Sequence, residues 1–160
     1  MPKRARSDHN AGVKRSASVT IAVPAPQLYE VVADLATYPA WLELVETAAP
    51  TNAPGEDHAW LVTLRAAVGP FARSKQLRMV RTVADGTSVR FERQELDDRD
   101  HANWVMSATV GSTNADHQST ATIELTYEGR LWTGPLDAVL DREIEKALSQ
   151  LPVYLQRSAS

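Results

Sequence analysis

The sequence contains no cysteine, which excludes disulfide bonds, thiolate metal ligands and cysteine nucleophiles. No stretch approaches the roughly 18 consecutive apolar residues that a membrane-spanning helix requires. The basic start of the chain is not followed by an apolar segment, so no secretory signal peptide is expected. These absences predict a soluble, cytoplasmic protein without a membrane span.

Motifs for nucleotide, metal and serine-hydrolase chemistry are also missing. The sequence has no dinucleotide fingerprint, Walker loop or Gly-x-Ser-x-Gly elbow. The histidines lie in the arm or in loops and lack the His-x-x-x-His spacing of a zinc site; they are His9, His58, His101 and His117. Ligation by His58 beside Glu56 and Asp57 is the weaker alternative. We therefore expect neither a cofactor nor a metal ion.

Charge is distributed unevenly along the chain. The net charge of the 160 residues is −3, yet residues 1–15 carry five basic side chains and only one acidic one. This segment lacks periodicity and is interpreted as a flexible basic arm. The remaining chain is acidic, which argues against binding to nucleic acid phosphates. Its length predicts a single domain over residues 16–157.

Apolar and polar residues alternate along most of the chain, which is the pattern of half-buried β-strands. Residues 17–23 alternate first, and Pro24 ends this strand. Asp85 and Gly86 are typical hairpin-turn residues between two later strands. Those later alternating segments cover residues 60–68, 77–83, 89–95, 104–110 and 121–127. Six or seven strands at this spacing predict an antiparallel sheet.

Helical periods occur at both ends of this series. The segment after Pro24 predicts a helix, because proline fits a first helical turn, and a second short helical piece is expected around residues 38–42. Apolar residues recur every three or four positions from Leu136 to Leu155, which predicts an amphipathic helix of about five turns. Pro152 is expected to kink or end its last turns. Its first half contains acidic residues that suit the positive end of a helix: Asp137, Asp141, Glu143 and Glu145.

Three short segments carry a family resemblance. They are SVTIAVPAP with LYEVVAD at 18–26 and 28–34, TYPAW at 37–41, and LWTGPL at 131–136. With the order of elements they resemble the START-related (SRPBCC) superfamily, which includes the birch-pollen allergen, and its polyketide cyclase/dehydrase-like branch. The resemblance covers about residues 15–157. It implies an α+β helix-grip fold, in which a curved antiparallel sheet of six to seven strands wraps around a long C-terminal helix, with two short helices after the first strand.

The resemblance also implies an elongated cavity between the sheet and the last helix, and an unfilled apolar concavity is the usual form of a small-molecule site. Because alternate residues of a strand face the same side, those on the inward parity of each strand are expected to line the cavity. From the sheet these are Trp60, Val62, Leu64, Leu77, Met79, Phe91, Trp104, Met106, Ile123 and Leu125. From the helix side the cavity would be closed by Leu140, Ile144, Leu148 and Leu151.

Three polar residues share the inward parity. Arg81 follows Met79, Arg93 follows Phe91, and Tyr127 follows Leu125, each by two positions. A buried guanidinium needs an anionic partner, backbone acceptors or water. One interpretation makes Arg81 and Arg93 anchors for a carboxylate or phenolate of a ligand. The other pairs them with Glu95 or Glu124, or places them at the cavity mouth.

These residues leave three functional hypotheses. The first is binding or transport of a hydrophobic small molecule, such as a lipid, polyketide or aromatic compound. The second is a polyketide cyclase or dehydratase in which Arg81, Arg93 and Tyr127 converge in one pocket. The third is a protein-interaction role, which a large exposed apolar patch would favour. The edge strands of such a sheet leave room for a weak homodimer, which nothing in the chain specifies.

Overall fold

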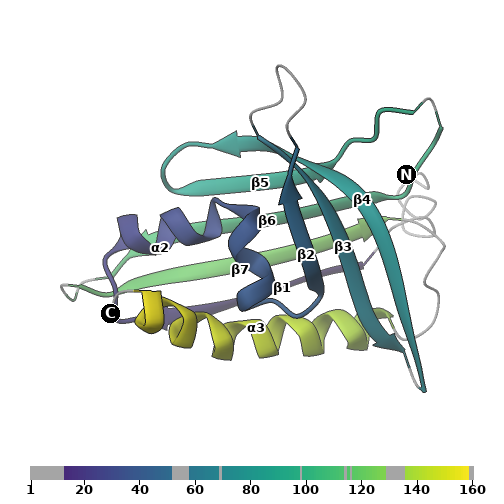
Figure 1. Ribbon diagram of the computed structural model, residues 1–160. Helices are drawn as coiled ribbons and strands as arrows, with labels where there is room; N and C mark the ends of the chain where they lie inside the picture. The colour runs from purple at the N-terminus through teal and green to yellow at the C-terminus, as the bar shows by residue number, and fades with distance from the viewer. Residues whose placement is uncertain are drawn as a thin grey trace, which may run out of the picture.

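In the computed structural model, a seven-stranded antiparallel sheet packs against one long helix, and two short helices follow the first strand (Figure 1). The structure describes residues 13–51, 58–68, 70–97, 99–113, 115, 117–128 and 136–158. The elements, in chain order, are β1 (Val13–Ile21), α2 (Ala25–Val32), the 3₁₀-helix η1 (Leu35–Ala40), β2 (Val45–Pro50), β3 (Ala59–Val68), β4 (Phe71–Ala84), β5 (Ser88–Arg93), β6 (Asn103–Ser112), β7 (Ser119–Glu128) and α3 (Leu136–Ser158).

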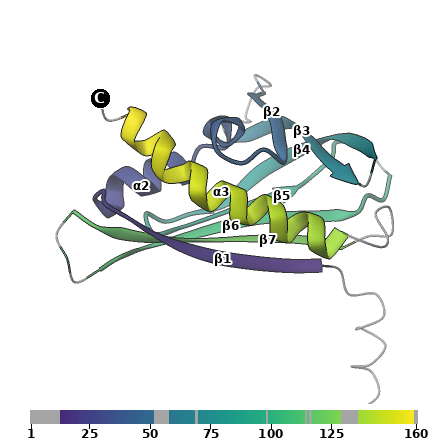
Figure 2. The same ribbon diagram turned by 90° about the horizontal axis from the view of Figure 1, so that it is seen from below.

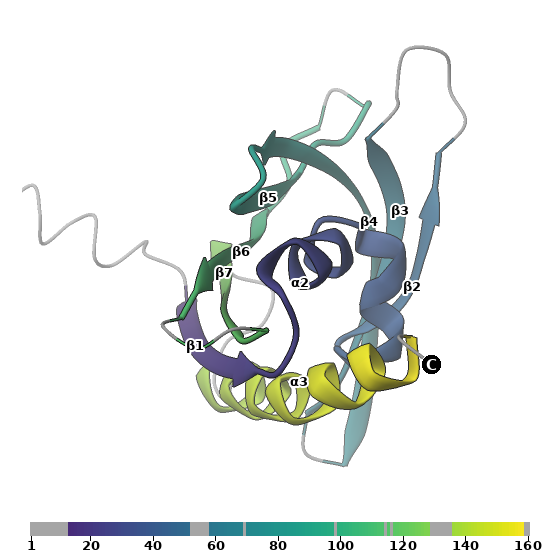
Figure 3. The same ribbon diagram turned by 90° about the vertical axis from the view of Figure 1, so that its left-hand side faces the viewer.

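The sheet has the strand order β1-β7-β6-β5-β4-β3-β2, so the first strand lies beside the last one and β1 and β2 form the edges. Seen end-on, the sheet curls from β1 round to β2, and α3 lies across the open side between the two edges (Figure 3). Figure 2 shows α3 running along the sheet on the side where β1 lies. This arrangement confirms the predicted helix-grip α+β fold. A homodimer through either edge stays a prediction.

The segment after β1 folds as its prolines and aromatic residues predict. Pro24 caps α2 without needing an N–H, and Asp34 accepts a hydrogen bond from the Ala36 amide at the start of η1. The Tyr38 and Trp41 rings pack in a tilted arrangement with their centroids 4.3 Å apart, and the Tyr38 hydroxyl donates to the Val32 carbonyl. Burial, with a smaller effect of Asp34, raises the pKa of Tyr38 far above its usual range. The two short helices therefore pack together as one unit beside the sheet (Figure 1).

The core lies between the inner sheet face and α3. The helix buries a stripe at three- and four-residue spacing, made of Val139, Leu140, Ile144, Ala147, Leu151 and Leu155. The helix continues through Pro152 to Ser158, so of the two expectations for this proline, an end of the helix is wrong, and a kink stays a prediction. Among the described residues, no helix combines the length and the apolar character needed to cross a membrane.

Several local expectations need correction. β1 begins at Val13, so residues 13–15 of the expected arm belong to the sheet, whereas residues 1–12 lie outside the described part. β2 was not predicted at all. The alternation of residues 77–83 predicts Val83 on the same face as Met79 and Arg81, yet Val83 is 38% exposed, because the register of β4 against β5 shifts between Arg81 and Val83. The expected family motif at 131–136 lies outside the described residues except for the backbone of Leu136.

Candidate ligand-binding site

The apolar residues predicted to line a site form one continuous buried face. Antiparallel register places Trp60 opposite Met79, and it aligns Phe91 with Met106 and Met106 with Leu125. None of the ten apolar sheet residues is more than 5% exposed. Opposite them on α3, Leu140 and Ile144 are buried, while Leu148 is half-buried. The structure thus brings the predicted set together.

Aromatic side chains pack closely within this face. The Phe91 ring meets Trp60 edge-on at 5.5 Å and Tyr38 edge-on at 5.8 Å between ring centroids. Trp104 and Tyr127 lie 4.6 Å apart in a tilted arrangement. Such contacts add to the free energy of burying the rings. These rings therefore form two packed aromatic groups on the inner face, one around Phe91 and one at Trp104 and Tyr127.

Arg81 ties the sheet to the end of α2. Its Nη1 donates to the Ala33 carbonyl at 2.7 Å, and its Nη2 contacts Nδ1 of His58 at 2.8 Å. Its guanidinium carbon lies 5.8 Å from the centre of the Trp60 ring, a cation–π distance. Ala33 is the C-cap of α2, where the helix leaves carbonyl groups unpaired and carries partial negative charge. The guanidinium group of Arg81 is thus already hydrogen-bonded to protein groups.

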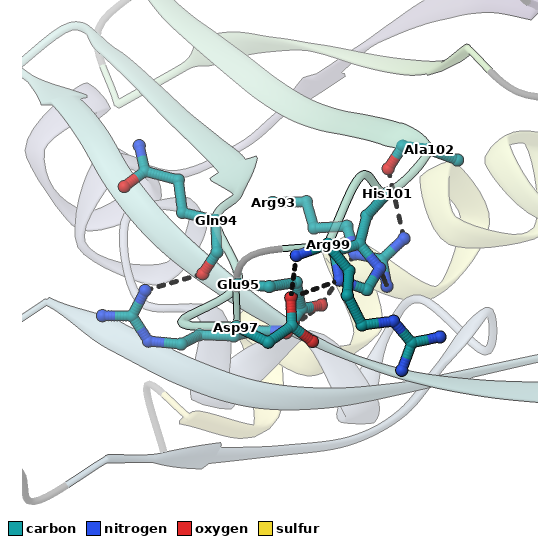
Figure 4. Close-up of polar contacts among 8 residues, drawn as sticks. Arg93, Gln94, Glu95, Asp97, Arg99, His101 and Ala102 are labelled. Carbon is teal, nitrogen blue, oxygen red and sulfur yellow. Dashed lines mark hydrogen bonds and ion pairs between the residues drawn. The ribbon is translucent and has the colours of Figure 1, made fainter.

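Arg93 is buried in a different polar network, shown in Figure 4. Its side chain is 5% exposed, and its Nε donates to Glu95 at 2.7 Å. Its Nη1 donates to the Ala102 carbonyl, and its Nη2 contacts Nδ1 of His101 at 3.2 Å. These partners confirm the pairing with Glu95, one of the two interpretations of this arginine.

The network continues from His101 to Asp97 (Figure 4). Because arginine only donates, Nδ1 of His101 is the acceptor, and Nε2 carries the proton towards Asp97 at 2.8 Å. This hydrogen bond, followed by one from the Arg99 amide, lowers the pKa of Asp97. A polar pocket of about 210 Å³ lies here, lined by Arg93, Glu95, Arg99, Asp100, His101, Ala102 and Asn103.

The three catalytic candidates stand in different surroundings. Arg81 binds the end of α2, Arg93 binds the β5–β6 loop, and Tyr127 packs its ring on Trp104. The two guanidinium groups therefore share no hydrogen-bond acceptor among the described residues. No group of three metal-ligating side chains occurs in the part of the chain that the structure describes.

Two further pockets flank the inner face. One of about 570 Å³ lies where α2 meets the β4–β5 turn and the end of β6, and it is lined by Ala25, Pro26, Tyr29, Glu30, Gly86, Thr87, Val110, Gly111 and Ser112. The other, of about 290 Å³, lies where α3 passes β3 and is lined by Glu43, Arg65, Ala66, Ala67, Ala72, Arg142, Glu143 and Lys146. The first has the volume of a typical small-molecule pocket.

Sequence reasoning missed three polar residues of these sites. His58 and His101 were placed in loops, with metal ligation as a weaker alternative for His58 and no contact with an arginine expected for either. No sequence signal links a loop histidine to an arginine on another strand. Glu143 was expected to serve the helix dipole, yet its side chain is only 6% exposed. A signal for Glu143 existed, because its spacing from Val139 and Ala147 places it within the apolar stripe.

Comparisons with known proteins agree with this fold. Residues 13–156 match the family described as polyketide cyclase / dehydrase and lipid transport, so the chain belongs to that family. No curated protein matches the chain in sequence.

Solved structures repeat the architecture at low sequence identity. A START superfamily protein from Mycobacterium smegmatis is 13% identical with a TM-score of 0.70, over 90% of this chain and 97% of that one. The Zhui aromatase/cyclase from Streptomyces sp. R1128 is 16% identical with a TM-score of 0.65, over 93% and 96%. The di-domain aromatase/cyclase StfQ of the steffimycin pathway is 13% identical with a TM-score of 0.65, over 98% of this chain and 55% of that one. These likenesses establish the fold and no activity.

Proposed function

We propose that the protein binds a hydrophobic small molecule, such as a lipid, polyketide or aromatic compound, between the sheet and α3, and carries or sequesters it. The observation that carries this proposal is the continuous apolar face from β3 to β7, opposed by Leu140 and Ile144 of α3. Small-molecule sites are mostly apolar, with a few polar groups that fix orientation. The lining of this site is the predicted set of sheet and helix residues.

The methionines of this face favour a site that adapts to its ligand. Met79 and Met106 lie in its centre, and unbranched thioether side chains change shape at low cost. The half-buried Leu148 lies at the margin, on the exposed side of the helix stripe. Binding would therefore involve movement of these side chains or of α3 itself.

Binding is better supported than catalysis by the partners of the inward arginines. Arg81 and Arg93 already donate to Ala33, Ala102 and Glu95, so neither guanidinium is poised to polarise a substrate carbonyl. A cyclase or dehydratase would need an acid or base in the site. The structural likeness to aromatase/cyclase proteins keeps that alternative open to experiment.

The first experiment is non-denaturing mass spectrometry of the purified protein, followed by organic extraction. One bound apolar molecule per chain is the expected result. Recovery of two compounds that differ by one water would instead favour the dehydratase alternative. A protein that is empty and also fails to bind the neutral probe N-phenyl-1-naphthylamine would contradict the proposal.

A larger side chain at the margin of the site should weaken binding of the same probe. We expect Leu148→Trp to weaken binding of N-phenyl-1-naphthylamine about tenfold, because overpacking costs roughly one to a few kcal/mol. Val153→Trp is the matched control, since Val153 lies on the same helix and is 42% exposed. Fluorescence titration of the probe measures both. Equal weakening by the two variants would show that the site does not lie under α3.

A further inference from the structure

The pocket of about 290 Å³ beside α3 is lined by the buried carboxyl group of Glu143, by three cations and by the exposed carboxylate of Glu43. It lies where the segment before β2, the end of β3 and the first half of α3 meet. Ala66 of β3 lines it, is 3% exposed and follows Leu64 by two positions on the inner face. Glu143 lines it from α3, next to Ile144. The pocket therefore adjoins the apolar face of the proposed ligand site.

Glu143 is unusual among the charged residues of the helix. Its side chain is 6% exposed, and its Oε1 has no hydrogen-bond partner among the described residues. Its Oε2 lies 3.9 Å from Nε of Arg142 and 3.9 Å from Nζ of Lys146, too far for hydrogen bonds. Burial, with a smaller effect of the Glu43 carboxylate, raises the pKa of Glu143 against the opposing effects of Lys146, Arg142 and the Leu44 amide. A buried oxygen without a donor costs free energy that a ligand could recover.

The cations around Glu143 are half exposed and already have protein partners. Lys146 contacts Glu43 at 2.8 Å, and Arg142 donates to the Ala67 carbonyl at 2.9 Å. Arg65 lies 3.9 Å from Glu46. Lysine and arginine offer several N–H groups each, so these side chains retain donors for a ligand at the pocket mouth.

This arrangement discriminates between ligand groups by charge. An ammonium group would approach Glu143 past three cations, of which Lys146 is paired with the Glu43 carboxylate, and a carboxylate or phosphate would face both Glu43 and the buried carboxyl group of Glu143. A neutral hydroxyl group suits both, because it donates one hydrogen bond and accepts others. We propose that Oε1 of Glu143 accepts a hydrogen bond from an alcohol or phenol hydroxyl of the hydrophobic ligand, while Lys146 or Arg142 donates to the same oxygen. This inference rests on the proposed function and adds the polar group that the site selects.

Three naphthalene probes test the hydroxyl selectively: 2-naphthol, 2-methoxynaphthalene, which cannot donate, and naphthalene itself. Binding is measured by isothermal titration calorimetry. The native protein should bind 2-naphthol about tenfold or more tightly than 2-methoxynaphthalene, as expected for a hydrogen bond to a charged acceptor. Glu143→Leu should lose this preference and keep its affinity for naphthalene within about twofold.

Two more variants separate recognition from folding. Glu145→Leu is the matched control, because Glu145 is exposed on the same helix and should keep the preference. Glu143→Gln retains an acceptor oxygen and most of the shape, so it should keep part of the preference if Glu143→Leu does not fold. Circular dichroism checks each fold.

The outcomes distinguish this inference from the function on which it rests. Binding of all three probes with no preference for 2-naphthol, or a preference that survives Glu143→Leu, overturns the role of Glu143 and leaves the hydrophobic site standing. Binding of 2-naphthol that needs Glu143 without any binding of naphthalene supports the hydroxyl contact and contradicts the apolar site. If none of the probes binds, both proposals fail.

Discussion

At the scale of single residues, the inward arginines illustrate two ways of placing a charge in an apolar face. Arg93 is paired with the carboxylate of Glu95, whereas Arg81 uses the carbonyl end of α2 and the face of Trp60. Arg93 therefore has a carboxylate as its counter-charge, whereas the partners of Arg81 are a backbone carbonyl, an aromatic ring and the His58 ring nitrogen. Removal of the Glu95 charge should therefore lower the free energy of unfolding, because the buried Arg93 would lose its counter-charge.

Glu95→Gln should lower the free energy of unfolding by about 2 kcal/mol, because it leaves the buried guanidinium without its counter-charge. The chain supplies a matched control in Arg90 and Glu92, which have the same spacing and a 2.9 Å contact on the exposed face. Glu92→Gln should cost less than about 0.5 kcal/mol. Urea unfolding measures both changes. Similar losses in the two variants would mean that Arg93 is satisfied without Glu95.

The same residues show what the alternation of a strand can predict and what it cannot. Parity placed Arg81, Arg93 and Tyr127 on the inner face, and all three side chains make contacts there. Strand parity could not identify the hydrogen-bond partners of these residues. His58 and Arg81 are 23 positions apart in the sequence and come into contact only in the folded chain. The use of these residues with a ligand stays a prediction.

At the scale of elements, the β4–β5 turn depends on one side chain and one backbone conformation. Oδ1 of Asp85 accepts hydrogen bonds from the amides of Thr87 and Ser88, at 3.0 and 2.7 Å. These bonds lower the pKa of Asp85. Gly86 has φ of +96°, which residues with a side chain rarely adopt. This turn borders the pocket of about 570 Å³, so its conformation shapes that opening.

Gly86→Ala should destabilise the protein by about 1 kcal/mol through backbone strain alone. No heavy atom lies within 4 Å of the added carbon, so steric overlap does not contribute. Gly111→Ala is the matched control, because Gly111 lines the same pocket, also has open space and does not have positive φ. Thermal unfolding compares the two. A loss in Gly111→Ala as large as in Gly86→Ala would contradict a conformational cause.

Elements with strong periodicity were predictable, and elements that depend on neighbours were not. β2 was missed because its sequence VETAAP buries only Val45 and lies at the sheet edge, where pairing with β3 replaces a hydrophobic signal. The irregular register of β4 turned Val83 outwards, and a bulge leaves no mark in an alternating pattern. α3 was predicted well, apart from the inward placement of Glu143.

At the scale of the whole molecule, α3 lies across the open side of the curled sheet. Polar side chains along the edges of the helix contact the sheet and the segment before β2. Asp141 pairs with Arg15 of β1 at 3.0 Å, and Lys146 pairs with Glu43 before β2 at 2.8 Å. Arg142 donates to the Ala67 carbonyl of β3. Exposed pairs of this kind contribute little free energy each. The helix is held to the sheet mainly by its buried apolar stripe, whereas the central strands are also joined to one another by backbone hydrogen bonds.

Amide hydrogen exchange should detect this difference as two levels of protection. We expect the amides of α3 to exchange faster than those of β6 and β7, because the central strands open only with global unfolding. Saturating N-phenyl-1-naphthylamine should slow exchange in α3 and leave β6 and β7 nearly unchanged, since a ligand under the helix stabilises only its closed state. Mass spectrometry of peptides from each element gives the rates. Equal exchange in α3 and β6, unaffected by the probe, would mean that the sheet and the helix form one cooperative core, and a ligand would then have to reach the inner face without moving α3.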